Sequence, residues 1–114
     1  EHTGAGLVQW IEKVAARETA GAGVEAKISG EAFLTEPGDF SALLADAIRA
    51  ETGVEAEFST SGGTSDARFI RRLCPVVEFG LPGQSMHKTD EHVAVDDLHA
   101  LTRIYGRILR EYFA

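Results

Sequence analysis

Apolar side chains recur at helical spacing in three separate parts of the chain. In each part they fall three or four residues apart, so they line one face of a helix. Between these parts the pattern breaks at glycine and proline, residues that typically mark turns. The pattern therefore predicts three helices, over residues 6–18, from residue 39 to the glycine at 53, and over residues 95–112.

Capping residues support these helices. Thr3 and Asp39 stand just before the first two helices, where side-chain oxygens of this kind accept hydrogen bonds from free backbone N–H groups. Gly53 follows the second helix, at a position where a left-handed backbone often ends a helix. Asp96 falls in the first turn of the last helix, where a carboxylate suits the helix dipole. The helices are therefore specified by nearby sequence.

Three short segments have the pattern of strands. Residues 24–28 alternate apolar with charged side chains, which is typical of a half-exposed strand. Residues 54–58 predict a second strand, and residues 75–79 contain two valines in succession, which indicates burial on both faces of a parallel or mixed sheet. Cys74 is expected to act as a small buried hydrophobe beside this last strand. The order of elements predicts an α/β fold.

Composition and charge narrow the class of protein. The 114 residues are 44% hydrophobic and 25% charged, which is typical of one small soluble domain. A net charge of −7 argues against non-specific nucleic-acid binding, and no apolar run approaches a membrane span. With a single cysteine and no visible signal peptide, these features indicate a cytoplasmic protein without nucleic-acid or membrane partners. The start at Glu1 rather than methionine predicts a piece of a longer chain.

A glycine-rich loop followed by an arginine is the first candidate site. Gly62 and Gly63 allow close approach of a ligand to the backbone, and N–H groups at the start of a helix bind anions. A short helix is predicted over residues 65–72, and Arg68 within it could bind a carboxylate with two hydrogen bonds. The pattern also fits a plain strand-to-helix turn, and both interpretations stay open. The missing Gly-Lys-Ser/Thr ending excludes a P-loop.

A second polar loop carries His87, with Asp90 and Glu91 close behind. A loop histidine near carboxylates can ligate a metal, act as a base or simply be solvated. The two carboxylates can orient the imidazole or remain surface charges. We expect both polar loops to lie at one edge of the sheet, where ligands commonly bind in α/β folds.

Four short stretches together resemble a known family of metallohydrolases. They read, in order, S-G-E-A-F-L-T-E-P-G, S-T-S-G-G-T-S-D-A-R-F-I, V-V-E-F-G and M-H-K-T-D-E. This combination resembles the C-terminal part of the bacterial succinyl-diaminopimelate desuccinylases, within the dinuclear zinc aminoacylase and carboxypeptidase superfamily. The resemblance covers essentially the whole chain. Acetylornithine deacetylases and other aminoacylases of the superfamily are the alternative, and V-V-E-F-G favours the desuccinylases.

The resemblance implies a particular fold, activity and assembly. Residues 1–30 would be the last helix and strand of an α/β lid domain that also forms a homodimer. Residues 31–114 would be the C-terminal part of a zinc-exopeptidase-like catalytic domain, a mixed sheet flanked by helices. Such enzymes remove succinate from N-succinyl-L,L-2,6-diaminopimelate, a small substrate with carboxylates, on the route to lysine and diaminopimelate.

The resemblance also implies site residues. His87 matches the family's C-terminal metal ligand, for a site of two zinc ions or of zinc and cobalt. Gly63 and Thr64 match the substrate loop, Arg68 matches an arginine near a substrate carboxylate, and Ser29 matches a binding serine at the domain junction. The family's other ligands and its general base lie upstream, so this chain is expected to hold no catalytic residue, to bind metal weakly and to be inactive alone. A non-catalytic anion-binding or assembly module is the competing function.

Overall fold

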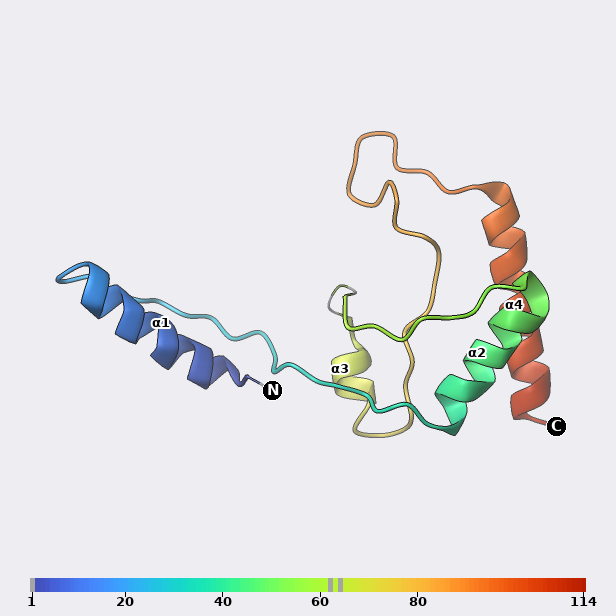
Figure 1. Ribbon diagram of the computed structural model, residues 1–114, viewed down its shortest axis with the longest axis horizontal. Helices are drawn as coiled ribbons and strands as arrows, with labels where there is room; N and C mark the ends of the chain where they lie inside the picture. Colours follow the sequence, from blue (N-terminus) through green and yellow to red (C-terminus); the bar gives the residue numbers. More distant parts are fainter. Residues whose placement is uncertain (1, 62, 64) are drawn as a thin grey trace. The chain divides into compact units, whose positions relative to one another are not determined.

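The computed structural model describes residues 2–61, 63 and 65–114 (Figure 1). The chain divides into two compact units, and one combines Glu1–Leu34 with Gly63–Cys74, whereas the other combines Thr35–Gly62 with Pro75–Ala114. We refer to them as unit 1 and unit 2. Unit 1 contains helices α1 (Gly4–Glu18) and α3 (Ala67–Ile70), and unit 2 contains α2 (Asp39–Thr52) and α4 (Val95–Tyr112).

Unit 2 is built on the packing of α2 against α4 (Figure 1). Both helices follow the predicted apolar spacing, and α4 has the predicted bounds. Their facing stripes come together because each stripe removes apolar surface from water when it is covered by the other. The buried cluster consists of Leu44, Ala47, Ile48, Ile104 and Ile108.

The start of α2 differs from the expectation. Gly38, not Asp39, is the N-cap residue, and Asp39 is the first residue of the helix. The buried Ser41 hydroxyl accepts a hydrogen bond from the Gly38 N–H at 2.8 Å and donates one to the Gly38 carbonyl at 2.8 Å. The expectation that Asp39 is the N-cap is therefore wrong, and the side chain of Ser41 bonds back to the backbone of the true N-cap, Gly38. The other end is confirmed, since Gly53 ends the helix with φ 73°.

An ion-pair network joins the end of α2 to α4. Glu51, whose side chain is only 16% exposed, lies 2.7 Å from Arg107 and 3.6 Å from Arg103. Arg107 also pairs with Glu111 at 2.9 Å. Two hydrogen bonds raise the pKa of the Arg107 guanidinium, and the bond to Glu51 has a larger effect than the bond to Glu111. One carboxylate of α2 thus holds two arginines of α4.

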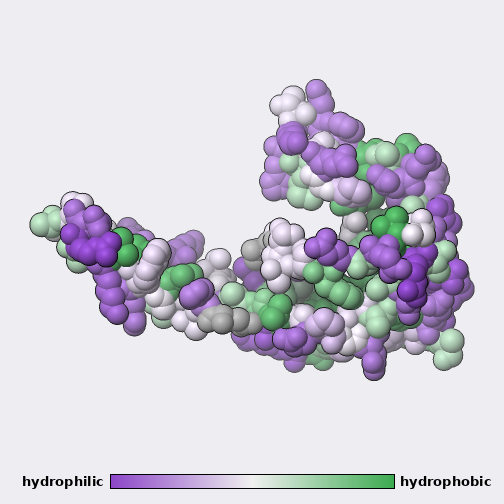
Figure 2. Space-filling model, in the orientation of Figure 1, coloured by the Kyte–Doolittle hydropathy of each residue, from purple (hydrophilic) through white to green (hydrophobic). Residues whose placement is uncertain are grey.

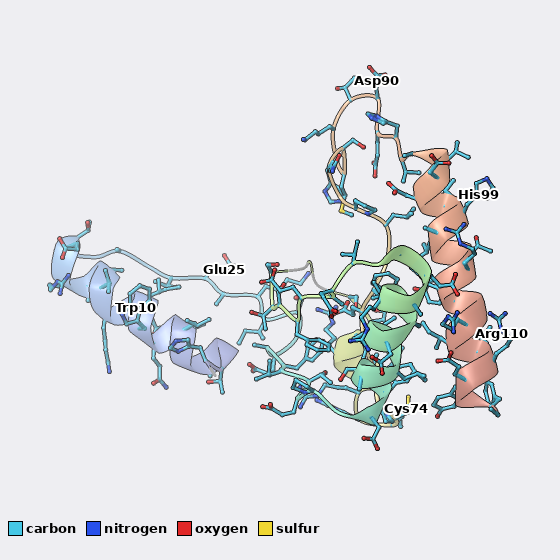
Figure 3. The ribbon with its side chains drawn as sticks, turned by 45° about the vertical axis from the view of Figure 1, so that its right-hand side comes forward. Trp10, Glu25, Cys74, Asp90, His99 and Arg110 are labelled. Carbon is cyan, nitrogen blue, oxygen red and sulfur yellow. The ribbon has the colours of Figure 1, made fainter. Side chains whose placement is uncertain are left out.

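The predicted strands over residues 24–28, 54–58 and 75–79 are wrong for the part of the chain that the structure describes, where no residue is in a strand. A helix satisfies its backbone groups within one segment, whereas a strand needs a neighbouring strand. No described segment provides such a neighbour, so the expected mixed sheet does not form. Cys74 is exposed in the turn that follows α3, and the expectation of burial is wrong too (Figure 3).

Residues 75–79 nevertheless cover the helical core of unit 2. Val77 and Phe79 are half-buried and pack against the cluster, with the exposed Glu78 between them. The Tyr105 hydroxyl donates to the Phe79 carbonyl at 2.7 Å, and the two rings lie 6.2 Å apart. The extended segment therefore lies on the helical core through Val77 and Phe79, whereas the burial on both faces expected from Val76 and Val77 does not extend to Glu78.

In unit 1, α1 has the predicted N-cap and ends as predicted at Glu18, but it begins at Gly4, two residues before the expected start. Thr3 is its N-cap, and the Thr3 hydroxyl oxygen accepts a hydrogen bond from the Gly6 N–H at 3.1 Å. No residue of the helix is buried, and Leu7, Trp10 and Ile11 are 43%, 63% and 44% exposed. Figure 2 shows hydrophobic residues on the surface of this helix, and Trp10 projects from it in Figure 3. The helix forms, but its apolar stripe is uncovered within the described residues.

The segment after α1 returns along the helix to its first turn (Figure 1). A Cβ at Gly4 would lie 2.9 Å from Ile28 Cδ1, so a larger residue there would displace the Ile28 side chain. The Gly4 N–H donates to Glu31 Oε2 at 2.7 Å. These contacts hold residues 28–31 beside the start of α1.

Among the described helices, none combines the length and the apolar content that crossing a membrane requires.

Candidate functional site

A small basic hollow in unit 1 lies between α3 and the segment after residue 29. Its volume is about 220 Å³. Two chain segments that are far apart in sequence make it, because the residues around Gly30 lie against the side chains of α3. Its walls are Gly30, Glu31, Ala32, Phe33, Arg68, Phe69, Arg71 and Arg72.

Arg68 has a spare hydrogen-bond donor at this hollow. Its guanidinium carbon lies 4.7 Å from the centroid of the Phe69 ring, in the range of a cation–π contact. Its Nε atom is buried and has no hydrogen-bond partner among the described residues. Buried donors are normally paired, so the hydrogen bonding of this guanidinium is incomplete among the described residues, and a guanidinium that lines a hollow is suited to an anionic ligand. This placement favours the carboxylate-binding interpretation of Arg68.

The charges around the hollow also favour an anion. Arg71 and Arg72 line it together with Arg68, and Glu31 is the acidic residue of its wall. The Glu31 carboxylate already accepts a hydrogen bond from the Gly4 N–H. Sequence reasoning singled out Arg68 alone, although the three arginines are spaced at i, i+3 and i+4, which places them on one face of a helical turn. That spacing was the available signal for Arg71 and Arg72.

The other predicted substrate residues have different placements. Ser29 is exposed and immediately precedes Gly30, so the structure brings it close to the hollow. Gly63 is exposed, and no described atom lies within 4 Å of the position that a Cβ there would take. Thr64 lies outside the described residues. Their roles in substrate binding stay predictions.

His87 belongs to unit 2, in a loop that one serine closes. The Ser85 hydroxyl donates to the His92 carbonyl at 2.5 Å and accepts from the His92 N–H at 3.0 Å. His92 Nδ1 lies 2.7 Å from the Asp90 carbonyl oxygen at the loop's tip (Figure 3). These roles of Ser85 and His92 were not foreseen from the sequence, in which neither residue has a distinctive neighbour pattern.

The backbone of this loop is strained at the candidate ligand. His87 and Asp90 have φ of 62° and 58°, in the left-handed region that side chains other than glycine seldom adopt. Strain of this kind persists only when surrounding contacts impose it, and it is frequent at functional sites. The geometry thus presents an exposed imidazole on a constrained loop, which suits a ligand role.

The residues of this chain do not by themselves fit a dinuclear metal centre. Within the described ranges, no group of three or more histidine, cysteine, aspartate or glutamate side chains is close enough to hold an ion. A zinc ion takes about four ligands. His87 could therefore be one ligand of a site whose remaining ligands come from elsewhere.

Comparison with known proteins identifies the class of this chain. The family model described as peptidase family M20/M25/M40 matches residues 2–111, and the chain belongs to this family. The relatives it matches include proteins named succinyl-diaminopimelate desuccinylase from Cereibacter sphaeroides strain KD131, 60% identical over 99% of this chain, and from Sphingopyxis alaskensis, 59% identical over 99%. The protein of the same name from Novosphingobium aromaticivorans is 61% identical over 94% of this chain.

These matches confirm the resemblance that the four sequence stretches indicated. Membership of the family fits a zinc-exopeptidase-like fold and a metal-dependent hydrolase, although the mixed sheet is not formed by the described residues. The chain spans about three-tenths of the length of these relatives, 31% of the first and 30% and 28% of the other two.

Proposed function

We propose that the protein carrying this chain is a metal-dependent amide hydrolase that removes succinate from N-succinyl-L,L-2,6-diaminopimelate, in the synthesis of diaminopimelate and lysine. The observation that carries the proposal is the 60% identity to a named desuccinylase over 99% of the chain. The shared name of the relatives favours this activity over that of an acetylornithine deacetylase. It also favours an enzyme over a non-catalytic anion-binding module.

In this proposal the hollow of unit 1 binds a carboxylate of the substrate. Arg68 supplies the charged hydrogen bonds, and Ser29, Gly63 and Thr64 are proposed as further substrate-binding residues. The three arginines that line the hollow support this assignment, because their charges attract a carboxylate.

The metal, the assembly and the location are parts of the same proposal. His87 would be one ligand of a site with two zinc ions, or zinc and cobalt, completed by residues outside this chain. Residues 1–30 would belong to the lid domain and form a homodimer, and residues 31–114 would belong to the catalytic domain. The protein would act in the cytoplasm.

The direct test is succinate release by the protein that carries this chain. We expect turnover of N-succinyl-L,L-2,6-diaminopimelate in the presence of zinc or cobalt, and much weaker turnover of N-acetylornithine. The 114-residue chain alone should give none, because one imidazole cannot hold the metal centre. The reverse substrate preference would exclude the desuccinylase assignment, and turnover by the isolated chain would refute the ligand argument.

The role of His87 is tested in the same protein. We expect His87→Ala to lower the bound metal and the rate together. His92→Ala is the matched control, since His92 lies in the same loop and bonds only backbone groups and the Ser85 hydroxyl among its recorded partners. Normal metal content in the His87 variant would remove this residue from the site.

Arg68→Lys tests the carboxylate site. An ammonium keeps the charge but cannot reproduce the planar fork of the guanidinium, so we expect KM to rise while kcat changes little. Steady-state kinetics of the purified variant measure both quantities. An unchanged KM would mean that Arg68 is structural.

A further inference from the structure

A second arginine of unit 1, Arg71, contacts the segment of residues 30–34 that lies beside Arg68. The guanidinium carbon of Arg71 lies 5.3 Å from the centroid of the Phe33 ring, in the range of a cation–π contact. Arg71 Nη1 also makes a long hydrogen bond, of 3.5 Å, to the Leu34 carbonyl oxygen. Both contacts join the end of α3 to residues 33–34.

The position of Arg68 depends on that same segment. A Cβ at Gly30 would lie 3.2 Å from Arg68 Nη1 and 3.3 Å from its Cδ, so backbone and guanidinium side chain are closely apposed. The Phe69 ring lies on the guanidinium as well. A displacement of the segment by a few tenths of an ångström would therefore change the room that Arg68 has.

Within the described ranges no strand ladder fixes the segment after residue 29, so its placement depends on individual contacts. At its start, Glu31 is tied to the first turn of α1. Toward its end, the recorded ties to α3 are those that Arg71 makes with Phe33 and Leu34. Without the contacts of Arg71 with Phe33 and Leu34, residues 33–34 could move away from α3, and the hollow would widen on that side.

We propose that Arg71 and Phe33 are positioning residues, which hold residues 30–34 against α3 so that the Arg68 guanidinium stays packed at the hollow, where it would bind a substrate carboxylate. A binding group that is already placed loses less conformational freedom when the ligand arrives, which increases affinity. That the ligand is a substrate carboxylate rests on the proposed function. The positioning role of Arg71 and Phe33 goes beyond that function.

Arg72 offers a matched control. It lines the same hollow and has the same charge as Arg71, but among the described residues it makes no cation–π contact with Phe33 and no hydrogen bond to Leu34. If Arg71 acted through its charge alone, loss of charge at either position would weaken binding of an anion similarly. If it acts through Phe33, the two positions will differ.

The first experiment measures KM and kcat for the succinylated substrate in the protein that carries this chain. We expect Phe33→Leu and Arg71→Gln each to raise KM about two- to five-fold, from the usual strength of such a contact, with kcat unchanged. The double variant should be no worse than either single one, because both remove the same interaction. Phe33→Tyr keeps the ring face and should restore the parent KM.

Arg72→Gln should change KM by less than the two other variants. Equal effects of Arg71→Gln and Arg72→Gln, with a normal KM for Phe33→Leu, would overturn the proposal in favour of charge alone. A fall in kcat with unchanged KM for Phe33→Leu would also overturn it, since a positioning role in binding predicts the opposite pattern.

The second experiment needs no turnover. With ¹⁵N-arginine in the same protein, hydrogen exchange of the Arg68 Nε–H reports directly on its burial, and Arg68→Lys identifies the signal. We expect faster exchange in Phe33→Leu and Arg71→Gln and parent-like exchange in Arg72→Gln. If the parent protein releases no succinate, the proposed function fails, but this measurement still decides whether Arg71 and Phe33 are positioning residues. Unchanged exchange of the Arg68 Nε–H in Phe33→Leu would overturn that role.

Discussion

Helices α2 and α4 bury their apolar stripes in each other, whereas α1 has the same kind of stripe and buries none of its residues. All three were predicted from one periodic pattern, and all three form. The difference shows that the pattern specifies the helix and its apolar face but not the surface that covers the face. For α1, that surface is not among the described residues.

The extended segments repeat this contrast. Residues 75–79 lack a strand partner, yet α4 holds them through Tyr105 and the core covers Val77 and Phe79. Residues 24–28 also lack a partner, and here Ile28 remains 50% exposed although it touches Gly4. An extended segment can therefore be held by helices when its apolar face meets a formed core, and it is held weakly when it meets an isolated helix.

Hydrogen exchange is the most sensitive test of the difference between the segments that contact a core and those that do not. We expect the backbone amides of α4 to be strongly protected and those of residues 24–28 to exchange almost freely, because only the former lie in hydrogen bonds backed by a core. The difference should span several orders of magnitude in rate. If residues 24–28 gain protection as protein concentration rises, they pair with another chain. Strong protection at all concentrations in a proven monomer would contradict the comparison.

The next largest effect is expected from cavity formation in the core. Ile104 is 3% exposed, so Ile104→Ala should lower the free energy of unfolding by about 2–5 kcal/mol. The matched change Ile11→Ala, at a position 44% exposed on α1, should cost less than about 1 kcal/mol. Urea denaturation followed by circular dichroism measures both. Equal losses would mean that α1 has a core of its own.

A smaller effect should follow from removing the hydroxyl that holds residues 75–79. Tyr105→Phe deletes the donor to the Phe79 carbonyl but keeps the ring contact. A net loss of about 1 kcal/mol is expected, the usual contribution of such a hydrogen bond. Thermal denaturation measures it, with Tyr112→Phe as a control on the same helix. Equal stability of Tyr105→Phe and the parent would show that the core alone holds the segment.

The smallest and most local effect is expected at the start of α1. Thr3→Ala removes the hydroxyl that accepts from the Gly6 N–H and should cost the helix about 1 kcal/mol. Because α1 has no buried residue, its helicity should fall while the unfolding of α2 and α4 stays unchanged. Residue-level chemical shifts distinguish the two regions. A shared loss of stability would show that they unfold as one unit.

Much of the candidate site was predictable for a local reason. Arg68 follows a glycine-rich loop and His87 lies in a polar loop with carboxylates, so residue type and neighbours made both candidates, and the family resemblance implied their roles. The structure places Arg68 on a helical turn and in the lining of the hollow beside Gly30. Arg71 and Arg72 share a spacing with Arg68 that was the available signal, but only the packing of residues 30–33 shows that all three line one hollow.

By itself, the sequence determined the helices, the end residues Thr3 and Gly53, and the family, since each depends on residues close together in the chain or on the order of short motifs. Only the tertiary structure decided that residues 75–79 lie on α4 without forming a strand, and that Gly30 and Phe33 lie beside Arg68 and Arg71. The physical reason is range. A helix closes its hydrogen bonds within four residues, whereas a strand, a core and a binding hollow each need a second segment, whose position no local pattern specifies.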